Sequence, residues 1–142
     1  MPTTRKAAAH WEGSLKEGKG HVELASSRVA TFDVSWPSRA ESPDGQTSPE
    51  ELIAAAHSSC FSMALSNVLG KAGNPPTRLD VAAEVDFTPG TGITAIRLSV
   101  TGQVDGIDQV GFEQAAADAK ENCPVSQALK AVPITLESAT LG

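Results

Sequence analysis

The chain has 142 residues, of which 40% are hydrophobic and only 4% aromatic, and it has no tyrosine. Its formal net charge is −6, and its 11 Lys and Arg residues are scattered, which argues against a phosphate-binding surface for nucleic acid. We expect one domain over residues 1–142 with an aliphatic, alanine-rich core.

The first third of the sequence predicts three strands followed by a loop. The strands cover residues 6–13, residues 21–25 and residues 28–34, with a hairpin turn at residues 18–20. Residues 35–46 are dense in Pro, Ser, Asp and Gly, which is typical of a loop. The N-terminal residues are too polar for the apolar region of a signal peptide, so we expect a cytoplasmic protein.

A long helix is predicted to begin sharply at Pro49. Ser48 suits the N-cap, Pro49 suits the first helical position, and Glu51 completes a capping box. No charge occurs from Leu52 to Leu69, a length that approaches a transmembrane span. The segment contains too many polar residues for a lone span in lipid, so we expect burial in protein and no membrane insertion. A small domain cannot easily bury such a helix on all sides, and a dimer partner would cover its second face.

The second half of the sequence predicts alternating strands and a broken helix. The expected elements are strands over 79–87 and 93–101, a helix over 108–122, a short helix over 124–130 and a strand over 133–140. Pro124 disfavours helical geometry at Cys123 and suits the start of the next helix. The fold class is therefore α+β with a mostly antiparallel sheet around a central buried helix that carries Cys60.

The two cysteines differ in their surroundings, which points to thiol redox chemistry with two different roles. Cys60 lies about three turns into the long uncharged helix, where burial raises the pKa of a thiol and the helix N-terminus is too distant to help. Cys123 lies at the start of a short helix, where a thiolate is favoured or a thiol is easily attacked. In a reducing compartment such a pair is more often catalytic or metal-binding than a structural disulfide.

A reactive Cys60 needs a positive charge or a hydrogen-bond donor from elsewhere. Arg39 is the best candidate among five arginines, because its turn-forming neighbours fix its backbone close before the helix. Glu50 could hold Arg39 by a bidentate ion pair. His57, one turn before Cys60, could donate to the sulfur or bond to a core carbonyl.

Each of these residues also has a plain structural explanation. A buried free cysteine is commonly inert, Glu50 suits the helix dipole, Arg39 could be a solvated loop charge, and His57 could be structural. Two distant cysteines and three histidines do not have the number and spacing of ligands for a zinc site, so we expect no metal.

Two segments resemble the signatures of a known family. Residues 48–65 (SPEELIAAAHSSCFSMAL) and residues 122–126 (NCPVS) resemble the two cysteine motifs of the OsmC/Ohr family of osmotically inducible and organic-hydroperoxide-resistance proteins. Residues 9–13 (AHWEG) and residues 106–108 (GID) resemble the OsmC branch, so the similarity spans essentially the whole chain. Ser48 departs from the family pattern, where Asn is usual, but it caps a helix equally well.

The resemblance implies an intertwined homodimer with sites at the subunit interface. It implies a peroxidase that reduces organic hydroperoxides, and hydrogen peroxide more weakly, in defence against oxidative and osmotic stress. Cys60 matches the peroxidatic cysteine and Cys123 the resolving cysteine, which form a disulfide within one chain. Arg39 and Glu50 match the family's arginine and carboxylate, although the flanks of Arg39 match less closely. The family needs no cofactor, and its reductant is a lipoylated protein or a small dithiol.

Two other functions are compatible with the same residues. A thiol redox sensor would use both cysteines, but a sensor of transcription needs a DNA-binding helix and a basic face, and neither is visible. A non-catalytic protein would bind an apolar ligand in a cleft lined by Phe61 and Met63. Steady-state turnover of peroxide with a dithiol separates an enzyme from both.

Overall fold

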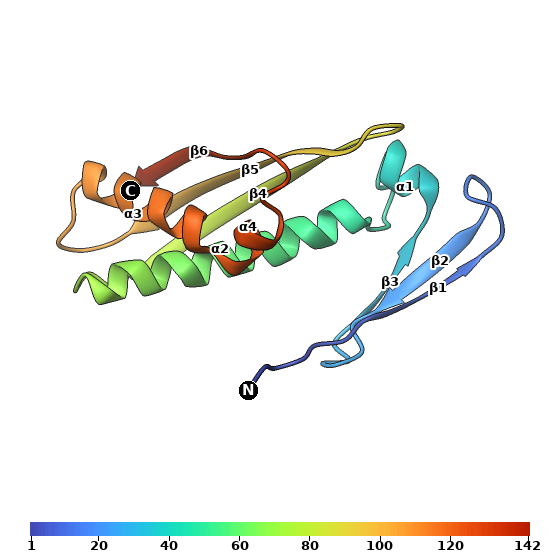
Figure 1. Ribbon diagram of the computed structural model, residues 1–142, viewed down its shortest axis with the longest axis horizontal. Coiled ribbons are helices and arrows are strands. Elements are labelled where there is room, and N and C mark those ends of the chain that lie inside the picture. Colours follow the sequence, from blue (N-terminus) through green and yellow to red (C-terminus); the bar gives the residue numbers. More distant parts are fainter. The chain divides into compact units, whose positions relative to one another are not determined.

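The computed structural model describes all 142 residues as six strands and four helices (Figure 1). In chain order the elements are β1 (Ala8–Glu12), β2 (Lys19–Glu23), β3 (Thr31–Val34), α1 (Trp36–Ala40), α2 (Pro49–Lys71), β4 (Arg78–Thr88), β5 (Gly92–Gln103), α3 (Gln109–Asn122), α4 (Pro124–Ala128) and β6 (Ile134–Leu141). The chain divides into two compact units, Met1–Leu52 and Ile53–Gly142.

The N-terminal unit contains an antiparallel sheet in the order β1-β2-β3. The ring of Trp11 in β1 lies over Gly20 of β2, where an added Cβ would be 2.7 Å from the ring. Glycine is therefore required at this close approach. The third strand is shorter than predicted, since Arg28 has a φ of 59° in a turn and the strand begins only at Thr31.

The prediction of an uninterrupted loop over residues 35–46 is wrong, because this segment contains the short helix α1. Ser35 is its N-cap, and the Ser35 and Ser38 side chains each accept from the other residue's backbone N–H at 3.2 and 3.0 Å. Pro37 lies in the first turn. The Ser and Pro residues that suggested a loop thus cap and start a helix.

Helix α2 begins at Pro49 as predicted and extends two residues beyond Leu69. The Ser48 hydroxyl accepts from the Glu51 N–H at 3.2 Å, as a capping box requires. The Glu51 carboxylate, however, accepts from the Thr47 hydroxyl at 2.5 Å.

The C-terminal unit contains a second sheet in the order β4-β5-β6. The strands β4 and β5 form a long antiparallel hairpin, and the alternation of partly buried and exposed residues along β4 confirms the predicted period of two. The strand β6 runs parallel to β5. A parallel neighbour needs a crossover connection, and α3 and α4 supply it. Three of the four strand pairings are antiparallel, which agrees with the predicted fold class.

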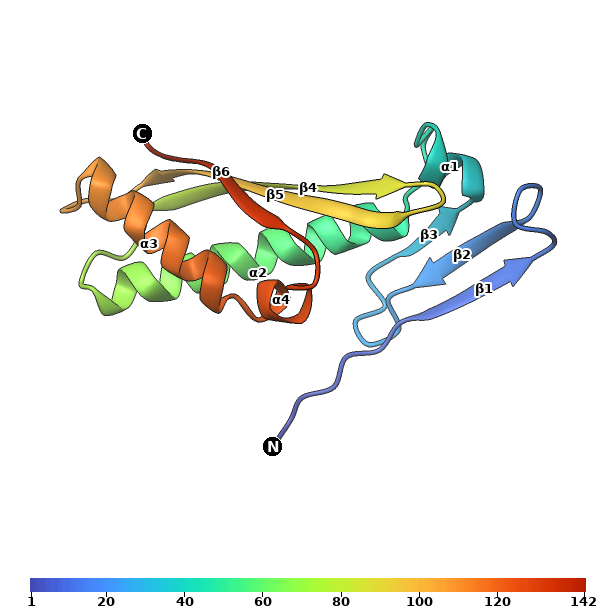
Figure 2. The same ribbon diagram turned by 45° about the horizontal axis from the view of Figure 1, so that its top comes forward.

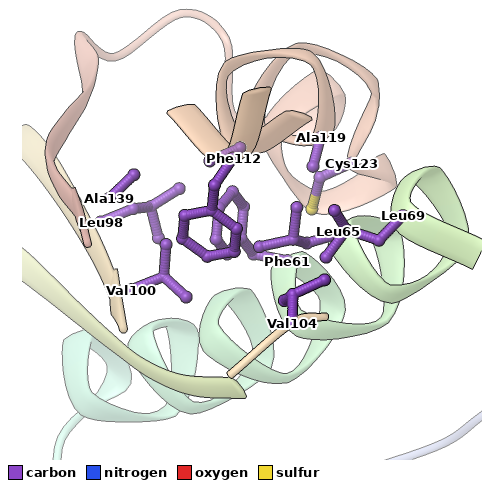
Figure 3. Packing of buried hydrophobic residues seen from close by; sticks show 11 residues of the cluster. Phe61, Leu65, Leu69, Leu98, Val100, Val104, Phe112, Ala119, Cys123 and Ala139 are labelled. Carbon is purple, nitrogen blue, oxygen red and sulfur yellow. The ribbon is translucent and has the colours of Figure 1, made fainter. Parts of the chain in front are cut away.

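The helices α2, α3 and α4 lie on one face of this second sheet (Figures 1 and 2). The buried core between helices and sheet contains Phe61, Leu65 and Leu69 of α2, Leu98 and Val100 of β5, Phe112, Ala116 and Ala119 of α3, and Ala139 of β6 (Figure 3). It also contains Val104 and Cys123, which lie between these elements. Gly102 of β5 leaves room for the ring of Phe112, since an added Cβ would lie 2.6 Å from it.

Only one stripe of α2 is buried within the chain. Phe61, Leu65 and Leu69 are fully buried at a spacing of four residues, whereas Met63 is 69% exposed. By length and composition α2 could cross a membrane, but its apolar stripe is the central part of this core. The predicted burial is thus confirmed for one face of the helix.

Candidate active site

Cys60 lies on the flank of the buried stripe of α2, and its side chain is partly buried. The Cys123 thiol and the backbone N–H of Val125 both lie close enough to the Cys60 sulfur to shift its pKa. The structure therefore brings together two cysteines that are 63 residues apart in the sequence.

Cys123 ends α3 and precedes α4, as the sequence predicts. Its N–H donates to the carbonyl of Ala119 at 2.8 Å, and its ψ of 124° is the extended geometry that a residue before proline adopts. The side chain is fully buried, and its sulfur points into the core near Leu65 (Figure 3). The first N–H groups of a helix have no acceptor within the helix, which leaves the Val125 N–H free to donate to Cys60.

The surroundings of Cys60 disfavour the thiolate within the single chain. Burial raises the pKa of Cys60, the Val125 N–H lowers it, and the neighbouring Cys123 raises it again, so that the pKa lies above the ordinary value. This direction agrees with the sequence-based argument that Cys60 needs an additional positive charge to ionise at neutral pH.

His57 is fully buried and its Nε2 lies 2.7 Å from the Ser126 hydroxyl. Its partner is therefore neither the Cys60 sulfur nor a backbone carbonyl, the two partners that the sequence suggested. Burial lowers the pKa of His57, which favours the neutral ring, and Nδ1 has no hydrogen-bond partner. Sequence reasoning missed Ser126, for which the only signal is its place in the second cysteine motif.

Arg39 and Glu50 form the bidentate ion pair that the sequence suggested. Arg39 Nε lies 3.0 Å from Oε1 of Glu50, and Arg39 Nη2 lies 2.8 Å from Oε2. The Glu50 side chain is only 7% exposed, in the first turn of α2, and Arg39 lies in the last turn of α1 rather than in a loop. A planar guanidinium held in this way has a fixed orientation.

An apolar pocket of about 360 Å³ adjoins Arg39 in the same N-terminal unit. It is lined by Trp11, Leu15, Val34, Ser35, Trp36, Arg39 and Pro49. The pocket combines aromatic and aliphatic walls with one cation, which suits a small molecule that has an apolar body and a polar end.

The predicted cleft between Phe61 and Met63 is not formed. Phe61 is fully buried in the core, whereas Met63 is 69% exposed, because residues two apart on a helix point in different directions. No group of three or more His, Cys, Asp or Glu side chains is arranged to hold a metal ion.

The candidate residues thus form two groups, each within one unit. The C-terminal unit holds Cys60, Cys123 and the His57–Ser126 pair, and the N-terminal unit holds Arg39 with Glu50. Two adjacent thiols can undergo reversible oxidation to a disulfide.

Comparisons with known proteins agree with these motifs. Residues 42–137 match the family model described as OsmC-like protein. The chain is 46% identical to the peroxiredoxin OsmC of Escherichia coli K12 over 140 residues, which is 96% of each chain. It is 31% identical to the organic hydroperoxide resistance protein OhrA of Bacillus subtilis over 129 residues, with 87% of this chain and 89% of that one covered. Among solved structures, an organic hydroperoxide resistance protein OsmC from Legionella pneumophila superposes with a TM-score of 0.73 at 27% identity, with 97% of each chain covered.

Proposed function

The chain belongs to the OsmC family, and we propose that it is a cysteine-dependent peroxidase that reduces organic hydroperoxides, and hydrogen peroxide more weakly. The observation that carries the proposal is the adjacency of the Cys60 and Cys123 thiols. The 46% identity to a peroxiredoxin over 96% of both chains supports it. We also propose a role in defence against oxidative and osmotic stress.

In the first step Cys60 is the nucleophile. Its thiolate attacks the terminal oxygen of the hydroperoxide, the O–O bond breaks, and the leaving alkoxide takes up a proton to become an alcohol. The sulfur is oxidised to a sulfenic acid while the peroxide is reduced. The Val125 N–H, which lowers the pKa of Cys60, stabilises the attacking thiolate.

In the second step Cys123 resolves the sulfenic acid. Its sulfur attacks the sulfur of Cys60, the S–O bond breaks, and the hydroxyl leaves as water, which gives a disulfide within one chain. An external dithiol then reduces this disulfide through a mixed disulfide and is itself oxidised. We propose a lipoylated protein or a small dithiol as this reductant. The two sulfurs carry the electron pair, so the chemistry requires no metal, flavin or haem.

We assign activation of Cys60 to Arg39, oriented by Glu50. The argument is that Cys60 has a raised pKa within the chain, and a fixed guanidinium is the kind of charge that reverses such a shift. The apolar pocket that adjoins Arg39 suits the organic part of a hydroperoxide.

We propose that the protein works as an intertwined homodimer in the cytoplasm, with both units of residues 1–142 in a single OsmC-like domain. Exposed apolar side chains in both units support the presence of a partner subunit. Met63 of α2 is 69% exposed on a helix without charges from Leu52 to Leu69, and Trp11 and Leu15 of the N-terminal unit are 41% and 57% exposed. A second copy of the chain would remove this apolar surface from water.

Steady-state turnover tests the proposed function. The purified protein should consume cumene hydroperoxide and tert-butyl hydroperoxide with dihydrolipoamide as reductant, and hydrogen peroxide more slowly. A mixture of isotopically labelled and unlabelled protein should give Cys60–Cys123 peptides that are uniformly labelled or unlabelled, which shows a bond within one chain. Formation of the disulfide without turnover would indicate a redox sensor, and mixed labelling would contradict an intrachain bond.

A further inference from the structure

The hydrogen bond between His57 and Ser126 connects the two helices that carry the cysteines. His57 precedes Cys60 by three residues on α2, and Ser126 follows Cys123 by three residues on α4. Each partner is therefore about one helical turn from a cysteine. The bond is 2.7 Å long and both side chains are buried, with exposures of 0% for His57 and 5% for Ser126.

We propose that His57 and Ser126 are positioning residues for the thiol reaction. Their hydrogen bond holds α4 against α2, so that the Cys123 thiol and the Val125 N–H both remain next to the Cys60 sulfur. The inference rests on the proposed function, because it assigns the pair a role in the steps carried out by Cys60 and Cys123.

The helix α4 needs such a contact because it cannot hold its own orientation. It has five residues and no side-chain cap at its N-terminus, and a helix this short is unstable by itself. Its backbone hydrogen bonds, from the Gln127 N–H to the Cys123 carbonyl and from the Leu129 N–H to the Val125 carbonyl, close the turn without attaching it to α2. Packing of Val125 against the core is non-directional, whereas a buried hydrogen bond has a preferred length and angle.

The identity of His57 also indicates more than packing. An apolar residue could fill a fully buried site on α2 without leaving any polar atom unpaired. His57 instead leaves Nδ1 without a partner while Nε2 is bonded to Ser126. An unpaired buried polar atom is unfavourable, so the histidine is explained best by what its other nitrogen holds.

The position of α4 controls two separate properties of Cys60. Disulfide formation needs the two cysteines within a narrow range of distances, and small displacements of reacting groups slow reactions strongly. The Val125 N–H stabilises the thiolate only while it points at the sulfur. Loss of the His57–Ser126 bond should therefore slow disulfide formation and also make Cys60 harder to ionise.

The test compares Ser126→Ala, His57→Leu and His57→Gln with wild type, and uses Ser138→Ala, which removes an exposed hydroxyl on β6, as a matched control. Stopped-flow kinetics and mass spectrometry measure what fraction of the Cys60 sulfenic acid becomes disulfide and what fraction becomes sulfinic acid as the concentration of cumene hydroperoxide increases. Alkylation of Cys60 against pH reports its ionisation. We expect disulfide formation about tenfold slower in Ser126→Ala and His57→Leu, with more sulfinic acid and an alkylation profile displaced to higher pH.

His57→Gln keeps an amide nitrogen close to the place of Nε2 and should recover part of both properties, and Ser138→Ala should match wild type. If His57→Leu does not fold, Ser126→Ala decides, because it removes a single oxygen atom. A folded Ser126→Ala protein with the wild-type division of products and alkylation profile would overturn the inference, even if its melting temperature falls. A wild-type protein that forms no disulfide would instead overturn the proposed function.

Discussion

The two units of this chain differ in what they bury. Every buried hydrophobic residue lies between Phe61 and Ala139, in the C-terminal unit, whereas the buried residues of the N-terminal unit are Ser38 and Glu50. One unit thus has an apolar core of its own, and the other buries a capping serine and one half of an ion pair.

The residues proposed for the sulfur chemistry and those proposed for its activation therefore lie in different units. The two cysteines lie close together in the unit that has its own core. The Arg39–Glu50 pair lies in the unit whose large apolar residues Trp11 and Leu15 remain exposed. We therefore expect disulfide formation to depend on the C-terminal unit, and ionisation of Cys60 to depend also on the N-terminal unit and on dimer assembly.

The largest effect is expected at Cys60, the proposed nucleophile. Cys60→Ser should abolish peroxide consumption and leave fold and dimer intact, because the substitution is nearly isosteric. Peroxide consumption with a dithiol measures the first expectation, and circular dichroism with size-exclusion chromatography measures the second. A retained rate above a few per cent of wild type would show that the nucleophile is another residue.

Loss of Cys123 should leave the first step and remove the second. Cys123→Ser should consume about one peroxide per subunit and then stop at the sulfenic acid, which excess peroxide oxidises to the sulfinic acid. The measurement is a burst experiment followed by mass spectrometry of the Cys60 peptide. Continued turnover with dithiol at the wild-type rate would show that Cys123 is not the resolving residue.

The packing of the C-terminal core is tested at Phe112. Its ring is fully buried against α2 and β5, so Phe112→Ala should lower the free energy of unfolding by about 3–5 kcal/mol. Val110→Ala on the same helix is the control, since Val110 is 60% exposed and should change stability by less than about 0.5 kcal/mol. Chemical denaturation gives both values, and equal effects would contradict the described core.

Activation by the N-terminal unit is tested at Arg39. Removal of a charge-assisted contact costs about 1.5–3 kcal/mol, so Arg39→Ala should slow the peroxide step by roughly one to two orders of magnitude at neutral pH. Burial raises the pKa of Cys60, so the thiolate fraction grows with pH and part of the lost rate should return in alkaline buffer. The alkylation rate of Cys60 against pH measures this, and an unchanged profile would exclude Arg39 as the activator.

The smallest effect is expected at Glu50. Glu50→Gln keeps the shape of the side chain but loses the charge that holds the Arg39 guanidinium by two hydrogen bonds. The peroxide step should slow in the same direction as in Arg39→Ala, but less. A loss larger than that of Arg39→Ala would show that Glu50 acts on Cys60 by another route.

The sequence alone determined those features that depend on neighbours along the chain. The cap at Ser48, the alternation along β4 and the helix break at Cys123–Pro124 are local patterns, and the structure confirms them. The Arg39–Glu50 contact was also predictable, because both residues flank one short connection.

Tertiary structure decided the features that join distant segments. The helix α1 was not predicted, because its Ser and Pro residues suit a turn and a helix cap equally well. The parallel direction of β6, the adjacency of Cys60 and Cys123 and the bond from His57 to Ser126 all depend on how α3 and α4 cross the sheet. Local propensity carries no information about such contacts, because they form only when the apolar faces of separate elements are buried against one another.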